Sequence, residues 1–261
     1  MPVVRIGRPG APGSEGGGQL RFHRLQVLRR VPHPGRGFTQ GLIVDGDTVW
    51  ESTGGYGESA LCRYQLGADH PDDCALLPPQ LFGEGICRAG AHIWQLTWRE
   101  RVALRWHPQH LEAPETVPYN REGWGICSAG GYVLTSDGST ELVRRDPRAL
   151  EPLGVIVVRL DGGRVMGLND LAWAAGLVWA NVLAQPYLLG IEPDSGEVTD
   201  VVDAGAVMER HPGDADAVLN GIAALPAAGE FLLTGKHWRS VYHVRLAEGR
   251  PRRHLRRLLA G

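Results

Sequence analysis

The sequence predicts an all-β fold, a five-bladed β-propeller closed by pairing an N-terminal strand with the last blade. Two observations carry this prediction. A pattern of a small anchor residue, an apolar strand, a glycine-containing turn and a second apolar strand recurs five times along the chain. Each recurrence is followed by further strand-like runs. Periods of about 40 to 50 residues with four short strands each are typical of propeller blades.

The anchors define the repeat and are glycines in every copy except the fourth. They are Gly41, Gly85, Gly125, Asp170 and Gly221, spaced by 44, 40, 45 and 51 residues. In the first four copies the second strand carries a large apolar residue nine positions after the anchor, namely Trp50, Trp94, Leu134 and Trp179. The fifth copy has Phe231 one position later, which requires a small insertion.

The outer strands of each copy follow in chain order. After the strand pairs come ALCRYQL and CALLPPQLF, then RVALRWHP and ETVPY, then ELVRRDP and EPLGVIVVRL, then YLLGIEP and EVTDVVDAG. The fifth copy ends with SVYHVRL and lacks one strand, so we expect LQVLRRV near the N-terminus to supply it. A β-sandwich is the alternative all-β fold, but it does not predict a repeat with matched anchors.

Composition limits the classes of partner. The chain has 261 residues and a net charge of −2, which gives no reason to expect nucleic acid as a partner. No run of about 18 apolar residues is present, so we expect no membrane span or membrane partner. We expect a disordered N-terminal segment over residues 1–19, a propeller over residues 20–247, a basic tail over residues 248–261, and a monomer. No signal peptide is visible, which indicates a cytoplasmic protein if the chain is complete and a secreted or periplasmic one if a signal was removed.

The cysteines and histidines predict no metal site and no cofactor. The four cysteines lack a metal-ligand spacing such as CxxC. Cys62 and Cys74 either close a short loop or remain two free thiols, and the sequence leaves both open. His107 and His110 lie in a proline-containing loop, where metal binding is not expected.

A ring of residues precedes the anchors. Its members are Gln40, Glu84, Trp124, Asn169 and Asn220, and none is aliphatic. The first strand of each propeller blade lines the central channel, so we expect these side chains at one mouth of it. The ring either forms a functional site or ties the blades together through hydrogen bonds and water. An unpaired carboxylate is costly to bury, which favours a functional role for Glu84.

Lys236 is the one lysine in a chain with 26 arginines. Arginine is a planar fork that stays charged, whereas lysine is a compact ammonium whose pKa can be shifted. Lys236 is therefore a candidate functional residue, with an accident of composition as the alternative.

Several motifs resemble those of the plant- and bacterial-type glutaminyl cyclases, which are five-bladed propellers. The matching pieces are FTQGL, ESTGGYG, FGEG, QLTW, GWG, SDG, LND, VWAN, VLNGIA and TGKHW, in family order over residues 31–243. The resemblance implies that the chain converts the N-terminal glutamine of a peptide substrate into pyroglutamate and releases ammonia. It also implies that no catalytic metal is needed.

The ring of residues before the anchors and the family resemblance together indicate the candidate site residues. The catalytic candidates are Glu84, Lys236, Asn169 and Gln40, and the substrate-binding candidates are Phe38, Trp98, Trp124 and Asn220. The chain departs from the family pattern at three positions. Asp170 and Ala172 stand where the family tends to have glutamates, and Leu183 stands where it tends to have a tryptophan.

Cyclisation of an N-terminal glutamine requires the residue types found among these candidates. The α-amine attacks the γ-carboxamide of its own residue, and the tethered ends make this ring closure entropically easy. Proton transfer and charge are then the difficult parts. Glu84 beside Trp98 and Trp124 suits a proton shuttle, because low polarity raises a carboxyl pKa. Asn169 and Gln40 can bind the carboxamide or the oxyanion.

Two questions stay open at this level. Lys236 would assist the reaction near the oxyanion, but paired with Glu84 it would lower the carboxyl pKa and weaken the base. The alternative function is a catalytically weak or inactive propeller that binds a peptide or small ligand at the same mouth. The departures from the family pattern at Leu183 and Ala172 are compatible with this alternative function.

Overall fold

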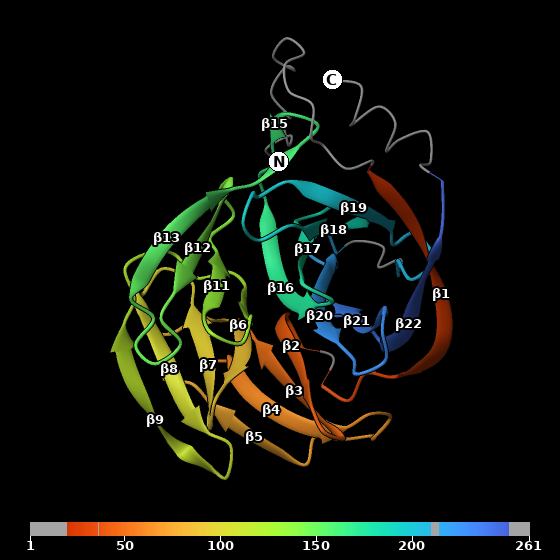
Figure 1. The fold of residues 1–261 in the computed structure, drawn as a ribbon. Coiled ribbons are helices and arrows are strands. Elements are labelled where there is room, and N and C mark those ends of the chain that lie inside the picture. Colours follow the sequence, from red (N-terminus) through yellow and green to blue (C-terminus); the bar gives the residue numbers. More distant parts are fainter. Residues whose placement is uncertain (1–19, 36, 210–213, 251–261) are drawn as a thin grey trace.

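The structure is a computed structural model, and it describes residues 20–35, 37–209 and 214–250. Within these ranges the regular secondary structure consists of β-strands, so the fold is all-β (Figure 1). No helix of this part of the chain is long and apolar enough to cross a membrane. The predicted disordered segment 1–19 and most of the predicted basic tail, residues 251–261, lie outside the described residues.

Three antiparallel sheets contain four strands each, in chain order. The first sheet consists of β2 (Thr39–Asp45), β3 (Thr48–Thr53), β4 (Ala60–Gln65) and β5 (Asp73–Leu76). The second consists of β6 (Gly83–Ala89), β7 (His92–Thr97), β8 (Val102–His107) and β9 (His110–Pro118). The third consists of β10 (Ile126–Ser128), β11 (Val133–Ser136), β12 (Glu141–Arg145) and β13 (Pro152–Val157).

The other long strands form one eight-stranded sheet in the order β16-β17-β18-β19-β1-β22-β21-β20. One half consists of β16 (Leu168–Ala174), β17 (Leu177–Val182), β18 (Tyr187–Ile191) and β19 (Val198–Asp203). The other half consists of β1 (Arg21–Pro32), β22 (Ser240–Glu248), β21 (Glu230–Gly235) and β20 (Leu219–Ala224). A small two-stranded sheet contains β14 (Arg159–Leu160) and β15 (Gly163–Arg164).

The N-terminal strand β1 joins the two ends of the chain. It pairs antiparallel with β22, from His23 opposite Glu248 to Pro32 opposite Ser240, as the sequence predicts. It also pairs parallel with β19 through residues 21–24, which the sequence does not predict. This second pairing merges two four-stranded units into one sheet.

The first strands of the four-stranded units meet at the centre of the molecule (Figure 1). β2 contacts β6, β6 contacts β10, β10 contacts β16, β16 contacts β20, and β20 contacts β2 again. This cyclic arrangement of sheets is consistent with a propeller. The positions predicted to carry large apolar residues lie in the second strands and are buried, from Trp179 at 4% exposed to Leu134 at 0%.

The anchor glycines are explained by the close approach of neighbouring first strands. A Cβ atom at Gly41 would lie 2.6 Å from the backbone nitrogen of Ile86, and one at Gly125 would lie 2.0 Å from the carbonyl oxygen of Asn169. These distances leave no space for a side chain. The repeat in the sequence therefore reflects backbone contact at the centre.

Two predicted strands are shorter in the structure. The run CALLPPQLF forms a strand only to Leu76, because Pro78 and Pro79 have no N–H to donate to a ladder. The run EPLGVIVVRL divides into β13 and β14 at Val158. Neither change affects the centre of the molecule.

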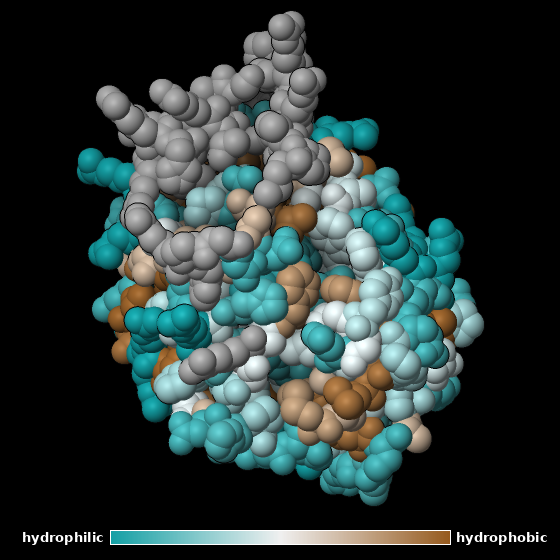
Figure 2. Space-filling view, turned by 180° about the vertical axis from the view of Figure 1, so that it is seen from behind, coloured by the Kyte–Doolittle hydropathy of each residue, from teal (hydrophilic) through white to brown (hydrophobic). Residues whose placement is uncertain are grey.

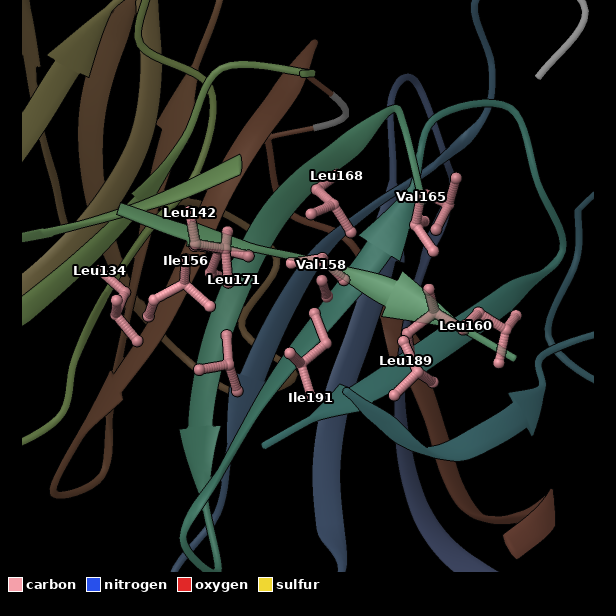
Figure 3. Packing of buried hydrophobic residues seen from close by; sticks show 14 of the residues in the cluster. Leu134, Leu142, Ile156, Val158, Leu160, Val165, Leu168, Leu171, Leu189 and Ile191 are labelled. Atoms are coloured by element: carbon pink, nitrogen blue, oxygen red, sulfur yellow. The ribbon is translucent and has the colours of Figure 1, made fainter. Parts of the chain in front are cut away.

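Apolar clusters between neighbouring sheets form the core. Figure 3 shows one of them, in which Leu134, Leu142 and Ile156 of the third sheet pack near Leu171 and Ile191 of the eight-stranded sheet. The face seen in Figure 2 is mostly hydrophilic, with apolar side chains gathered in a few places. The sheets are thus held together by side-chain packing between their faces.

Candidate active site

Seven of the eight predicted site residues line one pocket of about 270 Å³. The lining residues are Phe38, Gln40, Phe82, Glu84, Trp98, Trp124, Asn169, Leu183 and Lys236. Gln40, Glu84 and Asn169 lie on the central strands β2, β6 and β16, and the others lie on segments adjoining strand ends. The anchor repeat and the single lysine therefore converge on the same cavity.

Asn220, the eighth candidate, lies behind the pocket wall. It is fully buried, and its Nδ2 donates hydrogen bonds to the Thr39 carbonyl at 3.0 Å and to Gln40 Oε1 at 2.8 Å. Gln40 in turn donates from Nε2 to Glu84 Oε1 at 3.3 Å. Asn220 thus determines which end of the Gln40 amide faces Glu84, and it supports the pocket without lining it.

Glu84 is a buried carboxyl with a perturbed pKa. It is 5% exposed, and burial raises its pKa well above its usual range, against the opposing effect of the Lys236 charge. The nearby carboxylates Asp170, Glu100 and Glu122 raise it further. A carboxyl whose pKa is raised in this way takes up and releases a proton at higher pH than an exposed carboxyl does.

Lys236 is 8% exposed and faces an aromatic ring. Its Nζ lies 4.4 Å from the centre of the Phe38 ring, a cation–π contact. Burial lowers its pKa, against the opposing charges of Glu84 and Asp216. No salt bridge of Lys236 occurs within the described ranges, so its ammonium is near Glu84 without being paired to it. Asp216 lies close enough to raise the pKa of this lysine.

Aromatic side chains form one wall of the pocket. The Phe82 ring centre lies 6.1 Å from that of Phe38 and 5.5 Å from that of Trp98. Glycines make room for these rings. A Cβ at Gly54 would lie 2.2 Å from the Phe82 ring, and one at Gly138 would lie 2.5 Å from the Trp124 ring. The ESTGGYG and SDG motifs thus supply space for the wall.

Phe82 is a pocket residue that sequence reasoning missed. It precedes Gly85 by three residues, as Phe38 precedes Gly41. The repeat contained this signal, because equivalent positions of neighbouring sheets point into the same cavity. Leu183, which stands where the family tends to have a tryptophan, also lines the pocket.

Asp170 occupies the centre of the molecule, at the one anchor position that is not glycine. It is fully buried, and it accepts hydrogen bonds from the backbone N–H groups of its neighbour Leu171 at 3.0 Å and of Ile222 on β20 at 2.9 Å. Burial raises its pKa well above the usual range, although these bonds oppose the shift. Its carboxyl therefore joins β16 to β20, the two edge strands of the eight-stranded sheet.

Two buried polar atoms of pocket residues have no hydrogen-bond partner among the described residues. They are Nε1 of Trp124 and Oδ1 of Asn169. Buried polar atoms without partners are rare in folded proteins. A polar group bound in the pocket would gain from a hydrogen bond to either atom.

The structure shows which cysteines are bonded and which are free. Cys62 and Cys74 form a disulfide between β4 and β5, whereas Cys87 and Cys127 are free and buried. The His107 and His110 rings lie 5.2 Å apart. Over residues 20–35, 37–209 and 214–250, no three His, Cys, Asp or Glu side chains are grouped to hold a metal.

Comparison with known proteins gives one consistent result. A family model described as glutamine cyclotransferase matches residues 10–246. The glutaminyl-peptide cyclotransferase of Arabidopsis thaliana is 29% identical over 235 residues, which are 87% of this chain and 73% of the plant protein.

Solved structures extend the comparison. The crystal structure of Myxococcus xanthus glutaminyl cyclase has a TM-score of 0.81 and 32% identity, covering 89% of this chain and 100% of that one. The PQQ-bound aldose sugar dehydrogenase of Streptomyces coelicolor has a TM-score of 0.57 and 12% identity, covering 92% of this chain and 100% of that one. The second likeness concerns the fold alone.

Proposed function

Because the chain belongs to the glutamine cyclotransferase family, we propose that the pocket around Glu84 cyclises the N-terminal glutamine of peptides. The enzyme is a glutaminyl-peptide cyclotransferase, which forms pyroglutamate and releases ammonia. One observation carries the assignment of this activity to the pocket. A buried carboxyl with a raised pKa shares a cavity with Lys236, Asn169 and an aromatic wall.

The fold that we infer is a five-bladed propeller closed by β1. The cycle of contacts among the five first strands supports this inference. The antiparallel pairing of β1 with β22 also supports it, because β1 then serves as the outer strand of the last blade. We further propose that the protein acts as a monomer.

The proposed chemistry conserves protons over one cycle. The neutral α-amine of the substrate attacks the carbon of its own γ-carboxamide, and a nitrogen–carbon bond forms. Glu84 accepts the proton that this nitrogen loses. It then donates the proton to the amide nitrogen, whose bond to carbon breaks, and ammonia departs. One carboxyl serves as base and then as acid, which is efficient when its pKa lies near the working pH.

The remaining polar groups would stabilise charge and hold the shuttle in place. Attack on the carboxamide places negative charge on its oxygen, and preorganised donors or cations lower the energy of that oxyanion. Lys236 suits this role, because it is near Glu84 but not paired to it. The Asn169 amide lies in the same cavity. Gln40 holds Glu84 through the 3.3 Å hydrogen bond.

The size of the pocket supports recognition of one residue. Its volume of about 270 Å³ is below the range of about 300 to 1,000 Å³ typical of sites for drug-sized ligands. The aromatic wall of Phe38, Phe82 and Trp98 suits the methylene groups of a glutamine side chain. The peptide beyond that residue would extend towards solvent.

The proposal is tested by measuring ammonia release from a dipeptide that begins with glutamine. We expect ammonia and the pyroglutamyl dipeptide in equal amounts, with the same rate in the presence of a chelator. A dipeptide that begins with asparagine is the control, since its shorter side chain cannot close the five-membered ring. Binding of the glutamine dipeptide without ammonia release would favour the binding-only alternative.

A further inference from the structure

A buried histidine–glutamate pair lies beside the pocket and outside the proposed chemistry. His33 Nε2 lies 2.8 Å from Glu51 Oε2, and the two side chains are 0% and 2% exposed. Glu51 also accepts hydrogen bonds from Thr39 Oγ1 at 2.7 Å and from the Tyr64 hydroxyl at 3.1 Å. The carboxylate therefore has three partners from different parts of the chain.

Hydrogen-bond chemistry determines where the protons lie. His33 Nδ1 is 3.0 Å from the Trp238 carbonyl oxygen, which can only accept, so Nδ1 carries a hydrogen. Nε2 faces the carboxylate, so it also donates when Glu51 is ionised. Burial disfavours both charges, but each charge favours the other, and the pKa of His33 is raised while that of Glu51 is lowered. The two groups form a buried ion pair.

The pair reaches two segments that carry pocket residues. Thr39 stands between Phe38 and Gln40, so its bond to Glu51 holds the start of β2. Trp238 lies two residues after Lys236, so the bond of His33 to its carbonyl holds the turn after β21. A backbone hydrogen bond from His237 to the Gly37 carbonyl at 2.9 Å joins the same two segments.

We propose that the His33–Glu51 pair positions the active site by fixing the Phe38–Gln40 segment relative to the Lys236 turn. His33 directly follows β1, the strand that joins the chain ends, so the geometry of the pocket depends on that closure. His33, Glu51 and Thr39 are positioning residues, because they act through Gln40 and Lys236. This inference rests on the proposed function, which gives Gln40 and Lys236 their roles.

The chain offers a matched control at the other end of β1. Asp200 accepts hydrogen bonds from Thr199 Oγ1 at 2.7 Å and from Arg21, and it lies 2.6 Å from His23 Nε2. This cluster joins β1 to β19, and like the His33–Glu51 pair it combines a histidine, a threonine and a carboxylate. None of its members lines the pocket. Removing the Thr199–Asp200 bond therefore shows what loss of a threonine–carboxylate bond does away from the pocket. Removing the Thr39–Glu51 bond shows what the same loss does beside it.

The experiment compares Thr39→Val, Thr39→Ser and Thr199→Val with the wild type. Valine keeps the shape of threonine and removes the hydroxyl, whereas serine keeps the donor. Thr39→Val should lower kcat about 10- to 100-fold, since small misplacements of reacting groups cost that much. KM should change far less. Thr39→Ser should retain most of the wild-type kcat, and Thr199→Val should lower the melting temperature without lowering kcat.

Hydrogen exchange gives a second readout that does not require turnover. Peptides covering residues 37–41 and 234–239 should both exchange faster in Thr39→Val and remain unchanged in Thr199→Val. A wild type that releases no ammonia would overturn the proposed function, while faster exchange in both segments would still support positioning. Wild-type kcat in Thr39→Val, equal losses of kcat in both valine variants, or unchanged exchange in both segments would overturn the inference.

Discussion

Asn220 donates a hydrogen bond to Gln40 at 2.8 Å, and this bond turns the Gln40 amide so that its NH₂ group faces Glu84. Glu84, the proposed general base, is therefore held from behind by two amides in series. Asn220 has no other access to the pocket, since it is fully buried. Its contribution to activity should pass through Gln40 and through the Thr39 carbonyl, to which it also donates.

Asn220→Ala should lower kcat/KM at least about tenfold, because a misoriented amide no longer holds the carboxyl in place. It should also destabilise the protein by about 1 to 3 kcal/mol through unpaired polar groups. Asn181→Ala is the control, because Asn181 Nδ2 donates to the Leu219 carbonyl at 2.9 Å and Asn181 is not among the residues that line the pocket. Kinetics and thermal melts of both variants check this. A similar loss of kcat/KM in the two variants would contradict the relay.

Lys236→Arg should lower kcat at least about tenfold although it keeps the positive charge. The lysine is 8% exposed and its Nζ lies against the Phe38 ring, so the larger planar guanidinium cannot occupy the same position. Arg239→Lys, an exchange on the exposed side of the same turn, should leave kcat unchanged. Wild-type turnover by Lys236→Arg would show that only the charge matters there, or that the single lysine is an accident of composition.

The pH dependence of kcat/KM should have an acid limb with two titrations. The substrate amine must be neutral and Glu84 must be ionised, so the logarithm of the rate should fall with a slope of about two at low pH. Because burial raises the pKa of Glu84, its titration should lie above the usual glutamate value of about 4.3. Loss of the Lys236 proton should lower the rate at alkaline pH, below the usual lysine value of about 10.4, since its pKa is lowered. In Glu84→Gln the acid slope should fall to about one. A wild-type slope of one would exclude Glu84 from the titration.

The stabilising effect of the His33–Glu51 pair should weaken both at high pH and at low pH. The raised pKa of His33 means that its contribution is complete below the unfolded value of about 6.5 and is lost as pH rises through the folded value. The lowered pKa of Glu51 means that its contribution is complete above about 4.3 and is lost as pH falls further. Tyr64 and Glu209 also act on the pair, and neither reverses these directions.

Thermal melts of the wild type and His33→Gln measure this effect. The difference in melting temperature should be largest between about pH 4.5 and 6.5 and should shrink at higher pH. His23→Gln is a control on the Asp200 cluster, because it removes a histidine–carboxylate contact that is partly exposed. A difference that stays constant up to strongly alkaline pH would show that His33 is not charged in the folded protein.

Much of the pocket could be predicted from the sequence, because the same position of every repeat faces the same axis. Gln40, Glu84, Trp124 and Asn169 were found in this way, and the same periodicity would have found Phe82. Lys236 was found because it stands out in composition. These residues share a local signal, which is their offset from an anchor or their residue type.

Other features depend on contacts between distant segments and left no such signal. The parallel pairing of β1 with β19 is accompanied by a cluster in which Arg21 and His23 meet Asp200, far along the chain. The role of Asn220 behind Gln40 depends on how closely β20 approaches β2. A sequence pattern places residues on faces of strands, but it does not show which side chain stands in front of another.

The central claim is that Glu84 moves the proton, and the most direct measurement is ammonia release by Glu84→Gln. Glutamine keeps the shape of the side chain but cannot shuttle a proton. The variant should fold at least as well as the wild type, because burial penalises the charged form of this carboxyl and glutamine carries no charge. We predict that kcat falls about 10² to 10⁴-fold while the dissociation constant of a pyroglutamyl peptide changes little. Wild-type-like turnover by Glu84→Gln would contradict the account.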